Sequence, residues 1–171
     1  MTGPGFYQNP NGQPGAWVNR DGIPVDLMVP SALSNRTSPT GRSPRLPPHA
    51  KNAMRIATGL EGCVVDNTIM TITALDSSDH RAYDVRVAGT AALLVAKIHK
   101  IHERLTAPGR LQNKDAHDIY RMLVASEPDD LADAFRRLLA DPISVTTTDH
   151  ALEWLPEMFG NASATGADMA G

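Results

Sequence analysis

The chain has 171 residues, 42% apolar and 20% charged, which is enough for one ordinary hydrophobic core and excludes collagenous and wholly disordered proteins. Its single cysteine, Cys63, excludes a disulfide framework and any zinc site with two thiolates, and its net charge of −3 argues against a globally basic nucleic-acid binder. With no apolar run of about 20 residues and no signal peptide, it is expected to be a soluble, cytoplasmic protein without membrane contact.

The N-terminal quarter predicts one β-hairpin between irregular segments. Residues 1–15 alternate Gly, Pro and Asn, and we expect them to be disordered. The segments 16–18 and 23–29 are rich in β-forming residues, and an Asp-Gly turn joins them, which predicts a hairpin. Residues 30–48 are rich in Ser, Thr, Pro and Arg and predict a long loop.

The middle of the chain predicts sheet after one short helix. Residues 48–57 have the composition of a short helix. The segments 63–66, 68–75 and 83–87 are rich in Val, Ile and Thr, which predicts three strands. Together with the hairpin, these strands predict a small mixed sheet.

The C-terminal half predicts helices. Leu94, Ile98, Ile101 and Leu105 form one apolar stripe along a helix over 90–106. Three further helices are expected over 114–125, 128–140 and 146–159, with Pro128 at the first position of the second of them.

These elements predict an α/β (α+β) fold, in which a small mixed sheet is covered by a C-terminal group of helices. We expect one domain over 16–160 and a flexible tail over 161–171, because the tail is small and polar.

One helix face carries three cations. At 100° per residue, Lys97, Lys100 and Arg104 fall within about 60° of one another, away from the apolar stripe. Three cations this close need solvent or an anion, and the candidate anions are Asp115 and Asp118 of the next helix, or a phosphate group. Two interpretations follow: a solvated basic face with ion pairs between helices, or a phosphate-binding face.

Two motifs in this region carry a resemblance to a known family. The first is Lys-Ile-x-x-Ile-x-x-Arg over 97–104, and the second is Lys-Asp-x-x-Asp-Ile-Tyr over 114–120. Together with the entry to the first helix at 87–96 and the segment Ile-Pro-Val-Asp-Leu-Met-Val-Pro at 23–30, they resemble the nucleotidyltransferase-like proteins of the AbiEii abortive-infection toxin type. The resemblance covers roughly residues 16 to 125.

The resemblance implies a partial nucleotidyltransferase-like fold and transfer of a nucleoside monophosphate from an NTP to an acceptor, which in some relatives is tRNA. It implies Mg²⁺ as cofactor, with Asp26 as the third metal-binding carboxylate. Asp115 and Asp118 would act in the catalytic site by organising the pocket or orienting the substrate. A cognate antitoxin is a further implied partner. The nucleotide-binding cations implied are Lys97, Lys100, Arg104 and Lys114.

The first motif of that family, a Gly-Ser or Gly-Gly turn followed by an Asp-hydrophobic-Asp strand, does not occur in these 171 residues. We therefore expect the C-terminal portion of such a protein, produced by truncation, decay, a misplaced start or division between two chains. The alternative is a non-catalytic remnant or interaction module that binds a partner chain or a nucleotide. Without the missing strands, the strand of Asp26 would have an open edge, which predicts self-association.

Overall fold

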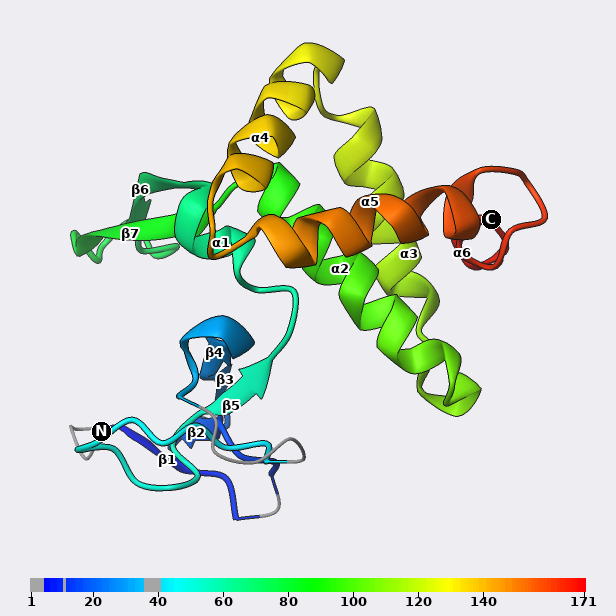
Figure 1. Cartoon of the computed structure of the whole chain (residues 1–171). Coiled ribbons are helices and arrows are strands. Elements are labelled where there is room, and N and C mark those ends of the chain that lie inside the picture. The colour runs from blue at the N-terminus through cyan, green and yellow to red at the C-terminus, as the bar shows by residue number, and fades with distance from the viewer. Residues whose placement is uncertain (1–4, 11, 36–40) are drawn as a thin grey trace. The chain divides into compact units, whose positions relative to one another are not determined.

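The structure, a computed structural model, describes residues 5–10, 12–35 and 41–171 (Figure 1). It is a mixed α+β protein, which confirms the predicted fold class. The chain forms two compact units, Met1–Thr58 and Gly59–Gly171, where the sequence predicted one domain over 16–160. Nine of the 13 prolines fall within the first 50 residues, so only short elements form there, whereas the long amphipathic helices all follow Gly59.

The N-terminal unit contains a three-stranded antiparallel sheet in the order β1-β2-β3. Its strands are β1 (Phe6–Gln8), β2 (Ala16–Asn19) and β3 (Pro24–Asp26). The pairing of β2 with β3 confirms the predicted hairpin. Trp17 is buried and its indole Nε1 donates a hydrogen bond to the carbonyl oxygen of Ala53 at 2.8 Å, which ties the sheet to a distant loop.

Two expectations for this unit need correction. Residues 6–8 of the segment predicted to be disordered form β1, because they pair with β2. The helix predicted over 48–57 is wrong: β5 (Arg55–Ala57) lies there and pairs in parallel with β4 (Met28–Pro30). That pairing joins segments far apart in sequence, so no local pattern could reveal it. Residues 1–4, 11 and 36–40 of the predicted disordered segment and loop lie outside the described residues.

The C-terminal unit begins with a short helix and a hairpin. The strands β6 (Asn67–Thr73) and β7 (Ala82–Ala88) pair antiparallel and confirm the second and third predicted strands. The first, over 63–66, is wrong, because α1 (Gly62–Val65) lies there. A Cβ on Gly62 would lie 3.3 Å from the Cα of Ala92 in the long helix that follows β7, so tertiary packing overrides the β-propensity of this segment. In place of one mixed sheet, the described residues form three separate sheets.

The remaining chain is helical, as Figure 1 shows. Four predicted helices are confirmed with ends that differ by at most one residue: α2 (Thr90–Leu105), α3 (Asn113–Val124), α4 (Pro128–Ala140) and α5 (Val145–Phe159). The short 3₁₀ turn η1 (Ser31–Leu33) belongs to the N-terminal unit, and η2 (Pro108–Arg110) connects α2 to α3.

The core of this unit lies between the helices. Leu94, Ile98 and Ile101 of the predicted stripe are buried, whereas Leu105, at the end of α2, is exposed. The segment predicted as a flexible tail contains α6 (Thr165–Ala170), because Met169 packs into this core. The other buried apolar residues of the cluster are Ala91, Val95, Ala116, Ile119, Ala134, Leu138, Ala151 and Met158.

Candidate functional site

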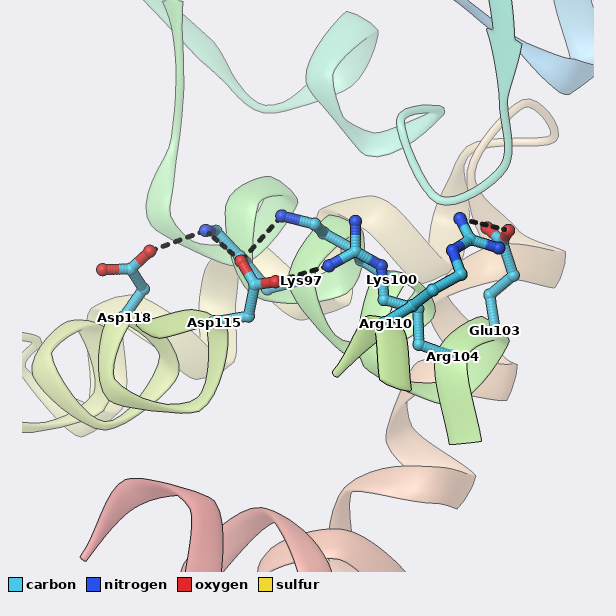
Figure 2. Close-up of polar contacts among 7 residues, drawn as sticks. All are labelled: Lys97, Lys100, Glu103, Arg104, Arg110, Asp115 and Asp118. Atoms are coloured by element: carbon cyan, nitrogen blue, oxygen red, sulfur yellow. Dashed lines mark hydrogen bonds and ion pairs between the residues drawn. The ribbon is translucent and has the colours of Figure 1, made fainter. Parts of the chain in front are cut away.

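Two neighbouring helices bring five predicted site residues together in what we call the cation cluster: Lys97, Lys100, Arg104, Asp115 and Asp118. The three cations follow one another at i, i+3 and i+7 on α2, and the two carboxylates at i and i+3 on α3, so each set lies on one helix face. The turn at η2 reverses the chain and lets the two faces meet. Figure 2 shows the cationic side chains directed at the carboxylates.

Asp115 is the centre of the cation cluster, and its side chain is only 1% exposed. Its Oδ1 accepts hydrogen bonds from the Nζ of Lys97 at 3.0 Å and of Lys100 at 2.8 Å. Its Oδ2 accepts one from Nη1 of Arg104 at 3.2 Å. Lys97 also donates to Oδ2 of Asp118 at 2.6 Å. The predicted ion pairs between the helices are therefore confirmed.

The ion pairs of the cation cluster shift the pKa of Lys97, Asp115 and Asp118 toward their charged forms. Burial acts most strongly on Asp115 and opposes its ionisation, but hydrogen bonds and charge from Lys100 and Lys97 together lower its pKa. Burial alone would lower the pKa of Lys97, yet its bonds to Asp118 and Asp115 raise it. Three cationic side chains against two carboxylates give the cluster a formal charge of +1.

Lys114, the fourth predicted nucleotide-binding cation, does not join the cluster. It lies on the first turn of α3, is exposed, and makes no ion pair with the residues that the structure describes. Figure 2 shows a separate pair between Arg110 and Glu103, 3.8 Å apart and exposed.

Asp26 lies in the N-terminal unit, whereas the cation cluster lies in the C-terminal unit. It is the last residue of β3, an edge strand of its sheet, and its side chain is exposed. Its Oδ2 is 4.0 Å from Nη2 of Arg55. The open edge predicted for this strand is present among the described residues.

The carboxylates described here do not match what Mg²⁺ needs. The ion requires several converging oxygens in octahedral geometry. No group of three His, Cys, Asp or Glu side chains within residues 5–10, 12–35 and 41–171 is arranged to hold a metal. Both oxygens of Asp115 are engaged by cations, and Asp118 is paired with Lys97. A magnesium site therefore needs ligands beyond these residues.

A pocket of about 310 Å³ lies at the start of α2 and α4, and it is a poor site for a triphosphate. Three carboxylates line it, those of Asp66, Glu127 and Asp130, and like charges repel. Asp66 accepts a hydrogen bond from the backbone N–H of Ala92 at 3.2 Å and pairs with Arg137 at 3.5 Å, so it has a structural role at the start of α2.

Sequence reasoning missed a ring cluster between α2 and α5. His102 stacks on Trp154 with ring centroids 3.6 Å apart, and His99 meets the same indole edge-on at 4.9 Å. The ring centroid of His150 lies 5.4 Å from that of Trp154, and the two ring planes are 22° apart. His99 is buried and its Nε2 donates to the carbonyl oxygen of Thr147 at 2.8 Å. Two spacings in the sequence could have indicated this cluster. His99 and His102 are three residues apart on one helix, and His150 and Trp154 are four residues apart on another.

The ring cluster is expected to make the protein less stable in mild acid. Burial, the largest influence, lowers the pKa of His99 below its usual 6.5, although Thr147 and Glu61 act in the opposite direction. The unfolded chain then binds a proton that the folded one excludes, so the free energy of unfolding should fall as the pH drops below about 6.5, by up to about 1.4 kcal/mol per pH unit. Urea titrations at several pH values measure this slope.

His99→Gln retains a side-chain donor but cannot titrate, so its unfolding free energy should depend less on pH in this range. His102 and His150, which both contact the ring of Trp154, remain in the variant, which therefore isolates the contribution of His99. An unchanged slope would contradict the prediction.

None of the helices in the part of the chain that the structure describes combines the length and apolar character needed to cross a bilayer. Comparison of the chain with models of protein families, with curated proteins and with solved structures finds no significant match.

Proposed function

We propose that this chain is a nucleotidyltransferase-like protein in which the cation cluster binds the phosphate groups of an NTP. The reaction is transfer of a nucleoside monophosphate to an acceptor, with tRNA as a candidate, and a cognate antitoxin is a candidate partner. In this proposal Asp26 needs further metal-binding carboxylates, which another segment or a second chain would supply. The proposal includes a cytoplasmic location, where nucleoside triphosphates are available.

The observation that carries the proposal is the formal charge of +1 on a face that water can reach. The side chains of Lys97, Lys100 and Arg104 are between 19% and 36% exposed, so water and a dissolved anion can reach each of them. Asp115 holds all three in place, so they pay little conformational entropy when an anion arrives. An ordered group of donors with excess positive charge is well suited to a phosphate.

The alternative is a non-catalytic interaction module. It is favoured by the ion pairs themselves, because every cation of the cluster already has a carboxylate partner, as a purely structural clamp between α2 and α3 would require. The two candidates differ in whether the cluster binds nucleotides.

The test is nucleotide binding by calorimetry with each NTP in turn. Lys97→Ala reduces the formal charge of the cluster to zero and should weaken NTP binding about tenfold, because a charge-assisted contact is worth about 1.5–3 kcal/mol. The matched control is Arg136→Ala, which removes one exposed, ion-paired cation from α4 and should leave binding unchanged.

Asp118→Asn provides a test of opposite sign. It frees Lys97 from one carboxylate and raises the formal charge of the cluster to +2, so NTP binding should become tighter. If the wild type, Lys97→Ala and Asp118→Asn bind NTP with equal affinity, the cluster is a structural clamp only, and the alternative is favoured.

A further inference from the structure

The β6–β7 hairpin exposes one apolar face. Residues that share a face of this antiparallel pair are Met70 with Val85 and Ile72 with Tyr83, which lie directly opposite each other. These four side chains are 40% to 61% exposed. In Figure 1 the hairpin extends from the helices of its unit beside α1.

The hairpin is also unpaired at its edges. Within the described ranges, β6 and β7 form a sheet of two strands, and no third strand adjoins either of them. An isolated two-stranded hairpin is marginal in water, and its outer edges present rows of free N–H and C=O groups to a further strand. Pairing with another strand would therefore stabilise it.

The sequence of β7 is complementary to itself when it is read in the opposite direction. It runs Ala82-Tyr83-Asp84-Val85-Arg86-Val87-Ala88, with Val85 at its centre. An antiparallel copy centred on Val85 places Asp84 opposite Arg86 twice and Tyr83 opposite Val87 twice. Opposite charges and aromatic–β-branched pairs are both favourable cross-strand neighbours.

We propose that the outer edge of β7 pairs with β7 of a second copy of this chain, antiparallel and centred on Val85, to form a four-stranded sheet with two-fold symmetry. The two charged residues already make hydrogen bonds on the face of the hairpin opposite to Val85. Asp84 accepts a hydrogen bond from the hydroxyl of Thr71 at 2.6 Å, and Arg86 donates one to Oδ1 of Asn67 at 2.9 Å. The two-fold axis brings each carboxylate to the guanidinium of the other copy.

The edge of β6 is the weaker candidate for the same contact. Its seven residues carry no charge, so self-pairing about Met70 has no ionic contact to fix the register. Because seven-residue edge pairing buries little surface, the dimer should be weak and its population should rise with concentration. This inference uses none of the cation-cluster residues and does not depend on the proposed function.

The test is a charge exchange read out by sedimentation velocity. Asp84→Arg places Arg opposite Arg in both contacts, and Arg86→Asp places Asp opposite Asp. Each variant alone should have a dimer dissociation constant at least about tenfold higher than that of the wild type. An equimolar mixture of the two should form a heterodimer, because every contact is again between opposite charges.

The mixture is also a control for misfolding, because two misfolded variants would not form a heterodimer. The double variant Asp84→Arg/Arg86→Asp should recover the homodimer. A wild type that stays monomeric at every concentration would overturn the proposal. So would an Asp84→Arg variant that dimerises as the wild type does, because the contact would then lie on the apolar face or at another edge, such as that of β3.

Discussion

Asp115→Asn should destabilise the C-terminal unit by about 2–4 kcal/mol. The substitution keeps the shape of the side chain but removes the charge that three cations share, and that charge is buried. Removing one partner of a buried ion pair leaves uncompensated charge, at a cost of about 3–5 kcal/mol. The expected loss is somewhat smaller because Lys97, Lys100 and Arg104 retain partial access to water. Chemical denaturation followed by circular dichroism measures it.

Asp118→Asn is the matched control for this prediction. It removes a carboxylate from the same face of α3, but this side chain is 42% exposed and contacts only Lys97 among the cations of the cluster, so little stability should be lost. An Asp115→Asn variant as stable as the wild type would contradict the role assigned to the buried carboxylate.

The pH dependence of the same variant follows from the lowered pKa of Asp115. A carboxylate whose pKa is lower in the folded state stabilises the fold above the unfolded value of about 3.8, and this contribution is lost as the pH falls through the folded pKa. The wild type and Asp115→Asn should therefore differ most near neutral pH and converge in acid below about 3.8.

The second large effect concerns catalysis. Assayed by itself, the chain should show no Mg²⁺-dependent transfer of labelled nucleotide to protein or RNA. The reason is the ligand count: Asp26 is exposed beside Arg55, and the oxygens of Asp115 are engaged by cations. A separate segment that carries the Gly-Ser…Asp-x-Asp strands should restore transfer if the remaining site is intact.

Two variants make the restored activity informative. Asp26→Asn should abolish it, whereas Asp21→Asn, which alters an exposed carboxylate in the adjacent turn, should not. A different result is that the unmodified chain labels the acceptor without the added segment, and that Asp26→Asn abolishes this labelling. That result would show that the chain itself contains all the carboxylates that the metal site needs. Failure of the added segment to restore any transfer would favour the interaction module.

The long helices could be predicted from sequence because their signals are local. The apolar stripe of α2, Pro128 at the start of α4 and the Asp-Gly turn of the first hairpin each act within a few residues. The two faces of the cation cluster were predictable for the same reason, since i, i+3 and i+7 spacing fixes which side chains share a helix face.

The errors lie where distant segments decide the structure. Cys63–Asp66 has β-forming residues, but packing of Gly62 against Ala92 favours a helix. The strand Arg55–Ala57 exists because it pairs with Met28–Pro30, and α6 is ordered because Met169 reaches the core. In each case the stabilising contact is remote in sequence and leaves no local periodicity.

The sequence by itself determined which residues carry charge on α2 and α3 and that ion pairs or phosphate could balance them. Only the tertiary structure decided that Asp115 is buried beneath three cations while Asp118 contacts one, because burial depends on how the two helices pack. Likewise, spacing could mark the histidines of α2, but only the packing of α5 against α2 brings Trp154 into contact with His99 and His102. Helix faces follow from local geometry, whereas their partners follow from long-range packing.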